Sequence, residues 1–284
     1  MNIQQALQQA SRDLSASSPS AMLDVQVLLS FVLRCNTAHL AAWPEKDLTK
    51  EQQSHYLQLI RQRLQGLPVA HLTGQREFWS LNFSVDNSTL IPRPETETLV
   101  EFILTNFTHR ENMKLLDMGT GTGAIAITIA NEKPEWQIVA SDVSKEALKL
   151  ARQNSEQHHT SNISFIQSDW FENITAVDFD IIVSNPPYVA SDDPHLQQGD
   201  VRFEPLSALT SGIAGMDDIE HLCSHAAGHL NNNGWLIVEH GYNQAQQVAE
   251  CFTKSGFSEI QQQQDISGHL RMTAGSLSID TTRS

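Results

Sequence analysis

The feature that most constrains the fold is a glycine-rich loop between two apolar segments. Residues 115–118 read Leu-Leu-Asp-Met, which predicts a buried strand, and Gly119, Gly121 and Gly123 follow at alternate positions. Residues 124–130, Ala-Ile-Ala-Ile-Thr-Ile-Ala, then predict a buried helix. Glycine lets the backbone turn tightly and approach a ligand closely at a helix N-terminus. The sequence therefore predicts a strand, loop and helix that bind a ligand.

A second strand with an acid at its end supports this prediction. Residues 136–141 are largely apolar, and Asp142 follows them, 19 residues after Gly123. A carboxylate at this spacing can accept hydrogen bonds from both hydroxyls of a ribose. The glycine pattern is Gly-x-Gly-x-Gly and differs from the Gly-x-Gly-x-x-Gly fingerprint of dinucleotide-binding proteins. Together these features predict a cofactor that contains a nucleoside.

The tetrapeptide Asn185-Pro186-Pro187-Tyr188 follows the apolar run at residues 179–184. Prolines lack an N–H group and hold φ at about −65°, and the first of them pushes Asn185 toward extended geometry. The result is a stiff loop at a strand end, with an amide oxygen, free backbone carbonyls and an aromatic ring. Such a loop suits holding a planar –NH2 group by its hydrogens. Taken alone, the tetrapeptide also fits an ordinary Pro-Pro turn.

From residue 93 onward, strand and helix patterns alternate along the chain. This alternation predicts an α/β fold with a doubly wound, mostly parallel, Rossmann-like sheet of seven strands. In such sheets ligands bind at the carboxyl ends of the strands, where the glycine loop and Asn185 both fall. One of the last two strands is expected to be antiparallel. The expected strands are residues 114–117, 137–141, 163–167, 181–184, 235–240, 257–264 and 269–277.

The N-terminal part of the chain has a different pattern. Residues 1–75 predict a small helical domain, and its apolar surface leads us to hypothesise that it recognises a protein substrate. Residues 76–92 predict a β-hairpin linker, in which a strand with period-two alternation meets a turn at Asp86-Asn87-Ser88 and a second strand at residues 89–91. Residues 93–284 then form the cofactor domain. The expected N-terminal helices are residues 4–14, 21–35 and 49–65.

Composition and charge narrow the class of partner. No apolar run approaches the roughly 18 residues that a membrane span needs, and the first residues lack the features of a signal peptide. The odd number of cysteines, without C-x-x-C spacing, favours free thiols in a reducing cytoplasm. The net charge is −15, and the densest basic stretch, residues 61–63, has only two arginines. We expect a cytoplasmic, monomeric enzyme that contacts neither a nucleic-acid backbone nor a membrane.

Three histidines could suggest a metal site. His221, His225 and His229 are spaced four residues apart, so they would share one face of a helix. Apart from Glu220 nearby, no acid or cysteine joins that stripe. We therefore favour a solvated helix face and expect no metal.

Several motifs together resemble class I S-adenosylmethionine (SAM)-dependent methyltransferases. These are the loop from Asp117 to Gly123, Asp142, the pair Asp169-Trp170 and the tetrapeptide at residues 185–188. Within that class, Asn-Pro-Pro-Tyr is typical of enzymes that methylate planar nitrogens. Residues 90–97 and 198–205 resemble motifs of the peptide chain release factor N5-glutamine methyltransferases, and the resemblance covers essentially the whole chain.

The resemblance implies a reaction and a set of site residues. A methyl group would pass from SAM, leaving S-adenosylhomocysteine, to the glutamine of the Gly-Gly-Gln motif in class I release factors. Asn185, Pro186 and Tyr188 would be catalytic: the Asn185 side chain and the Pro186 carbonyl would accept the amide hydrogens, and Tyr188 would stack on the amide. Substrate-binding residues would be Asn185, Pro186, Pro187 and Tyr188. Cofactor-binding residues would be Gly119, Thr120, Gly121, Thr122, Gly123, Asp142, Asp169, Trp170 and Asn185.

Three alternatives remain open. A methyltransferase for adenine or guanine amines of DNA or RNA would use the same Asn-Pro-Pro-Tyr chemistry, although the absence of basic clusters disfavours it. A Rossmann oxidoreductase is disfavoured by the glycine spacing. A SAM-binding sensor without activity would keep the glycine loop and would not need Asn185.

Overall fold

The computed structural model describes residues 1–278 as two compact units. Unit 1 comprises Met1–Gln75 together with Pro194–Phe203. Unit 2 comprises Arg76–Asp193 and the chain from Glu204 onward. The sequence prediction places residues 194–203 in the C-terminal domain, whereas in the structure they pack with the N-terminal helices. Each unit is therefore built from segments that are not adjacent in sequence.

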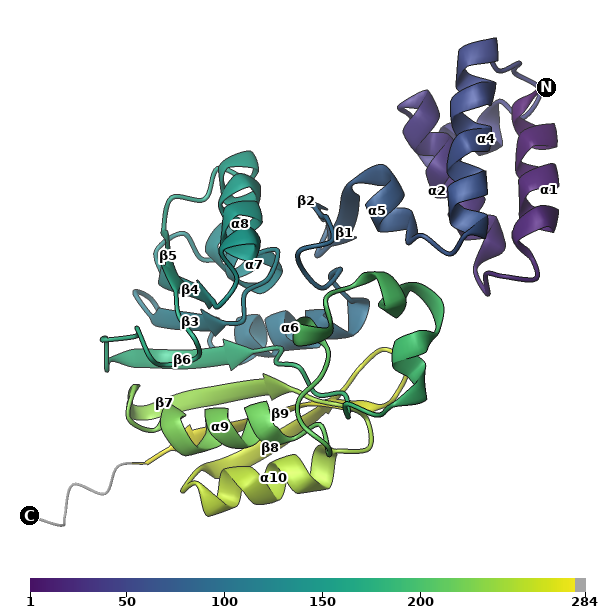
Figure 1. The fold of residues 1–284 in the computed structure, drawn as a ribbon. Helices are drawn as coiled ribbons and strands as arrows, with labels where there is room; N and C mark the ends of the chain where they lie inside the picture. The colour runs from purple at the N-terminus through teal and green to yellow at the C-terminus, as the bar shows by residue number, and fades with distance from the viewer. Residues whose placement is uncertain (279–284) are drawn as a thin grey trace, which may run out of the picture. The chain divides into compact units, whose positions relative to one another are not determined.

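Unit 1 is a small helical bundle (Figure 1). Its long helices lie where the sequence predicts them, and two of them begin at capped residues. The side chain of Asn2 caps the first helix and that of Thr49 caps the fourth, each as part of a capping box. Apolar faces of these helices form a common core around Leu28 and Tyr56. The helices are α1 (Ile3–Leu14), α2 (Ala21–Leu33), α3 (Thr37–Ala42), α4 (Lys50–Leu64) and α5 (Val69–Thr73).

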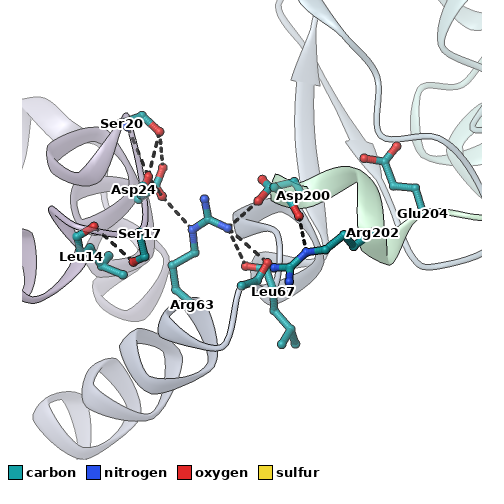
Figure 2. Close-up of polar contacts among 12 residues, drawn as sticks. Leu14, Ser17, Ser20, Asp24, Arg63, Leu67, Asp200, Arg202 and Glu204 are labelled. Carbon is teal, nitrogen blue, oxygen red and sulfur yellow. Dashed lines mark hydrogen bonds and ion pairs between the residues drawn. The ribbon is translucent and has the colours of Figure 1, made fainter. Parts of the chain in front are cut away.

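A buried ion network ties residues 194–203 into unit 1 (Figure 2). The guanidinium of Arg63 on α4 donates to Asp24 of α2 at 2.8 Å and to Asp200 at 2.6 Å. Asp24 also accepts hydrogen bonds from the hydroxyls of Ser18 and Ser20, both at 2.8 Å. Arg63 and Asp24 are buried. The Asp200 side chain is partly exposed, and its pairing with buried Arg63 connects the segment to α4. The segment itself forms two short helices, η2 (Pro194–Gln197) and η3 (Gly199–Phe203).

Unit 2 is built on a seven-stranded sheet within the described residues, in the order β5-β4-β3-β6-β7-β9-β8. The first five strands in that order pair in parallel, while β9 runs antiparallel to both β7 and β8. This confirms the predicted mostly parallel, doubly wound sheet, although β7 begins before the predicted residue 235. The strands are β3 (Lys114–Met118), β4 (Gln137–Asp142), β5 (Ile163–Gln167), β6 (Phe179–Ser184), β7 (Leu230–Glu239), β8 (Ser258–Gln264) and β9 (Leu270–Leu277).

Helices cover both faces of this sheet and bury its strands (Figure 1). One buried cluster joins α6 and α7 to alternate strand residues such as Leu115 and Val183, and the other joins α9 and α10 to residues such as Leu116 and Ile182. Strands buried on both faces explain the continuous apolar runs in the sequence. The elements are η1 (Pro94–Thr96), α6 (Glu97–Asn106), α7 (Ala124–Glu132), α8 (Lys145–Gln157), η4 (Leu206–Ala208), α9 (Asp217–Ala226) and α10 (Ala245–Lys254).

The predicted position of the hairpin turn is wrong. The hairpin consists of β1 (Gln75–Phe78) and β2 (Leu81–Ser84), and its turn is Trp79-Ser80 rather than residues 86–88. Both turn residues have positive φ, 51° and 61°, as a tight two-residue hairpin turn requires. Tertiary contacts hold Trp79 there: its backbone N–H donates to Glu97 and its indole N–H to Glu132. Period-two alternation could not reveal this, because Trp79 fits the apolar pattern of a strand.

The structure also bears on membrane-spanning segments and on the state of the cysteines. Within residues 1–278, the structure has no helix that combines the length and apolar character needed to cross a membrane. In the same range the cysteines are free thiols, with Cys223 buried and Cys35 and Cys251 partly exposed. The described fold therefore owes its stability to packing and hydrogen bonding, without a disulfide cross-link.

Candidate active site

A cavity of unit 2 lies where several parallel strands end. Its walls include Gly119–Thr122 after β3, Asp142 at the end of β4, Asp169 and Trp170 after β5, and Asn185 after β6. This is the carboxyl edge of the sheet, where ligands bind in doubly wound folds. The structure thus brings most of the predicted cofactor-binding residues to one cavity.

The glycines of the loop after β3 have two different roles. Gly119 and Gly121 have positive φ, 70° and 55°. Among the described residues, a Cβ added at Gly119 would meet no atom within 4 Å, and one at Gly121 would meet only Thr89, at 3.9 Å. Their backbone is therefore open to a ligand in the cavity. Gly123 does not line the cavity, and a Cβ there would lie 2.6 Å from Ile127, so this glycine allows close packing at the start of α7.

Asp117, at the end of β3, forms hydrogen bonds that stabilise this loop. It is fully buried, and its Oδ2 accepts hydrogen bonds from the Thr120 hydroxyl at 2.6 Å and from the Ala126 N–H at 3.1 Å. Burial raises the pKa of Asp117 to about 7, while these hydrogen bonds act in the opposite direction. Asp117 does not line the cavity, so its contribution is to fix the shape of the loop.

Asp142 connects the loop to the next strand and lines the cavity. One carboxylate oxygen accepts the Gly121 N–H and the other accepts the Ser144 N–H, both at 2.9 Å. Burial raises the pKa of Asp142, and the backbone hydrogen bonds oppose that shift. A carboxylate has about four acceptor positions, so acceptor capacity remains for a hydroxyl donor in the cavity. The geometry suits the predicted contact with a ribose.

Asp169 and Trp170 form another part of the wall. Trp170 has a positive φ of 43°, and its indole N–H donates to Asp218 of α9 at 3.1 Å. Asp218 also lines the cavity, and the Ser211 hydroxyl accepts its backbone N–H. The ring of Trp170 is thereby held at its edge, which fixes its orientation beside the cavity. Sequence reasoning missed Asp218, since nothing in the sequence links α9 to this loop.

The tetrapeptide after β6 is divided between the cavity and the interior. Asn185 and Pro187 line the cavity, whereas Pro186 is buried. The Asn185 Nδ2 donates to the Thr96 hydroxyl at 3.1 Å, which leaves Oδ1 as the group that can accept. The Tyr188 hydroxyl donates to Glu239 of β7 at 3.1 Å. Tyr188 is not among the residues that line the cavity. Stacking of Tyr188 on a substrate amide therefore stays a prediction, as do the roles of the Pro186 carbonyl and of Asn185.

Two segments that resembled family motifs meet at the cavity. Glu204 is buried, and its carboxylate accepts the Ile91 N–H at 3.2 Å and pairs with the Arg93 guanidinium. This pairing joins the chain around residues 90–96 to the chain around residue 205. Both stretches supply wall residues that the sequence analysis did not name individually: Leu90, Pro92, Arg93, Thr96, Pro205 and Ser207.

His221 and His225 of α9, and His229 shortly after it, take part in an aromatic stack. The rings of His221 and His225 stack with centroids 4.2 Å apart, and His229 stacks on Phe171 at 4.7 Å. Within residues 1–278, no group of three histidine, cysteine, aspartate or glutamate side chains is arranged to hold a metal ion. The stack instead packs beside Trp170, whose ring lies 6.3 Å from that of His221.

Comparisons with known proteins agree with the fold and cover both units of the chain. The profile described as "Methyltransferase small domain" matches residues 95–200, and the profile "PrmC N-terminal domain" matches residues 5–74. A methyltransferase structure from Pyrococcus furiosus aligns with a TM-score of 0.55 at 20% identity, covering 77% of this chain and 98% of that chain. The hMettl16 catalytic domain, solved in complex with an RNA hairpin, aligns with a TM-score of 0.57 at 16% identity, covering 79% of this chain and 84% of that chain. At these identities the structural likeness shows the fold.

The sheet order and the profile match define the class: this chain is a methyltransferase with a Rossmann-like fold. Its curated relatives are closer. A release factor glutamine methyltransferase of Shewanella oneidensis is 46% identical over 96% of this chain and 95% of its own length. The protein of the same description from Escherichia coli is 42% identical over 97% of this chain and 99% of its own length. The chain belongs to the release factor glutamine methyltransferase family.

Proposed function

We propose that this protein transfers a methyl group from SAM to the side-chain amide nitrogen of a glutamine in class I release factors. The observation that carries this proposal is the position of Asn185. Its NH2 group is held by Thr96, so its oxygen is available on the same cavity wall as the glycine loop and Asp142. The names of the relatives, which match along nearly the whole chain, supply the substrate.

The cavity fits SAM by the chemistry of its walls. The open backbone at Gly119 and Gly121 can approach the amino-acid part, and the remaining acceptor capacity of the Asp142 carboxylate suits a ribose hydroxyl. Trp170 offers a fixed aromatic ring to the adenine, and Asp169 a carboxylate for its amino group. When bound, SAM supplies a methyl group on a positively charged sulfur.

The residues of the loop after β6 position the methyl acceptor. An amide nitrogen is a poor nucleophile because its lone pair is delocalised, so orientation must contribute much of the rate. Asn185 Oδ1 accepts one hydrogen of the substrate –NH2 group and the Pro186 carbonyl accepts the other. As positive charge develops on the nitrogen, these hydrogen bonds strengthen, which stabilises the transition state more than the ground state. The methylated amide is acidic and loses its proton to water, so no strong base is required.

We assign recognition of the protein substrate to unit 1. The exposed positions of α2 carry Met22, Leu23 and Phe31, all large and apolar. Aromatic residues and Met are enriched at the cores of protein-binding surfaces. We further propose that the protein is a cytoplasmic monomer that makes no direct contact with nucleic acid. The nucleic-acid alternative is not favoured, because the relatives that match both units are named for release factors.

Replacing one of these apolar side chains by a charge should weaken substrate recognition. Leu23 is 58% exposed, so Leu23→Asp should leave unit 1 folded. We expect kcat/KM for a release factor to fall by about fivefold to tenfold, corresponding to about 1 kcal/mol of interface energy. SAM affinity should not change. The matched control is Gln9→Asp, an exposed position of α1, and an equal kcat/KM for the two variants would refute the assignment.

The cofactor assignment predicts the effect of Asp142→Ala. Loss of charge-assisted hydrogen bonds to the ribose should weaken SAM binding by roughly 1–3 kcal/mol. Glu146→Ala, which removes an exposed carboxylate from the first turn of α8, should bind SAM as the wild type does. Calorimetry measures both affinities. If the protein bound NAD and did not bind SAM, the assignment of SAM as the cofactor would be wrong.

Labelled SAM tests the substrate class directly. The wild-type protein is incubated with labelled SAM and, separately, with a purified class I release factor, duplex DNA or ribosomal RNA. We expect label in the release factor only. Transfer to either nucleic acid, with none to the release factor, would refute the proposed function.

A further inference from the structure

A buried glutamine that has no part in the proposed reaction holds the C-terminal end of the tetrapeptide at residues 185–188. Gln244 directly precedes α10 and is 6% exposed. Its Nε2 donates to the Tyr188 carbonyl at 3.0 Å and to the Gly215 carbonyl at 3.1 Å. Its Oε1 accepts the Gly241 N–H at 2.7 Å. This one side chain therefore joins the loop after β6 to the chain before α9 and to the chain after β7.

The backbone partners of Gln244 require both an acceptor and donors on one side chain. A backbone N–H can only donate and a backbone carbonyl can only accept, so these partners fix which end of the amide is oxygen. An ionised carboxylate of the same length has no hydrogen to donate, and an apolar side chain would form none of these bonds. Helix capping does not account for the side chain, because Gln244 is the N-cap residue of α10 but makes no side-chain hydrogen bond to that helix.

The chain before α9 approaches the tetrapeptide too closely for a side chain at the point of contact. Gly215 has a φ of 72°, and a Cβ there would lie 2.3 Å from the Tyr188 carbonyl oxygen. Directly after Tyr188, the backbone contact continues as a parallel bridge between Val189 and Thr210. Gln244 thus adds a side-chain restraint where two backbone segments already pair.

We propose that Gln244 is a positioning residue for methyl transfer, which acts through the Tyr188 carbonyl to hold the tetrapeptide in place. Because Pro186 and Pro187 hold φ at about −65°, the loop is stiff, and a displacement at Tyr188 carries over to the Pro186 carbonyl. That carbonyl is one of the two hydrogen-bond acceptors in the proposed reaction. The inference rests on the proposed function for the identity of the methyl acceptor.

Gln244→Glu tests the proposal in steady-state methylation of a release factor. Glutamate keeps the length and can accept the Gly241 N–H, but its ionised form cannot donate to the two carbonyls. We expect kcat to fall by about tenfold to hundredfold, because a misplacement of about 1 Å can cost about 10²-fold. KM for SAM should stay within about threefold, since Gln244 does not line the cavity and separate sites couple weakly.

Two further variants control for the added charge. Gln247→Glu makes the same change at an exposed position of α10 and should keep kcat within about twofold, as surface substitutions usually do. Gln244→Met removes the three hydrogen bonds without adding a charge, and it should lower kcat as Gln244→Glu does. A wild-type kcat in both variants of Gln244 would overturn the proposal.

Backbone hydrogen exchange, followed by NMR without a methyl acceptor, measures the restraint on the loop independently of the reaction. The N–H groups of Val189 and Ser191 donate to the carbonyls of Leu209 and Gly212, both at 2.9 Å. Both should exchange at least about tenfold faster in the two variants of Gln244, because local opening becomes easier. If the wild-type protein failed to methylate the release factor, the proposed function would be wrong, and faster exchange would still support the restraint. Wild-type exchange rates in both variants would overturn the positioning role.

Discussion

Asn185→Ala is expected to lower kcat for release factor methylation by about 10²–10³-fold, comparable with the loss of one oriented hydrogen-bonding group in other active sites. In the proposed reaction, Asn185 Oδ1 accepts a hydrogen from a nitrogen that gains positive charge during the transfer, so the contact is strongest in the transition state. The cavity loses only one wall contact, and the glycine loop and Asp142 are unchanged. SAM affinity should therefore change much less than kcat.

Two further variants separate chemistry from structure at this position. Asn185→Asp keeps an acceptor oxygen but cannot donate to Thr96, and it adds a negative charge, so we expect partial activity. Asn243→Ala changes an exposed asparagine that follows β7 and should keep kcat within about twofold, as expected for surface substitutions. Single-turnover kinetics at saturating SAM measure all three. Turnover near the wild-type value in Asn185→Ala would mean that the loop is structural.

Arg63→Ala should destabilise the protein by about 3–5 kcal/mol, as measured for other buried ion pairs that lose one partner. The substitution leaves the Asp24 carboxylate buried, with the Ser18 and Ser20 hydroxyls as its remaining side-chain partners within residues 1–278. It also releases Asp200, so the segment at residues 194–203 loses its anchor on α4. We therefore expect unit 1 to unfold at a lower denaturant concentration.

Arg61→Ala is the matched control for this experiment, since Arg61 is exposed on the same helix. Its effect should remain within about 0.5 kcal/mol, as is usual for surface positions. Urea unfolding followed by far-UV circular dichroism measures both variants. If Arg63→Ala unfolded at the same urea concentration as Arg61→Ala, the network would contribute nothing to stability.

The architecture of unit 2 could be predicted because local patterns and global packing agree. Strands buried on both faces give continuous apolar runs, and their alternation with helices predicts a mostly parallel sheet. Prediction failed where a tertiary contact decided the local geometry. Trp79 adopts positive φ because Glu97 and Glu132 bind its two N–H groups, and these partners lie far along the chain.

In the candidate site, too, some residues could be predicted from local sequence patterns and others could not. Residues at or directly after strand ends, such as Asp142 and Asn185, were predictable because the carboxyl ends of parallel strands meet at one edge. Thr96, Asp218 and Glu239 were not, since each contacts the site residues from an element that is distant in sequence. Residues 194–203 belong to unit 1 through Arg63, a pairing that no periodicity encodes.

The most direct test of the central claim is to locate the transferred methyl group. A purified class I release factor is incubated with SAM and the wild-type protein, and its Gly-Gly-Gln peptide is sequenced by tandem mass spectrometry. A release factor whose Gly-Gly-Gln glutamine is replaced by alanine serves as the control substrate. The proposed function predicts one added methyl group on the glutamine side chain and none on the control. A methyl group elsewhere in the release factor, or equal methylation of the control, would contradict it.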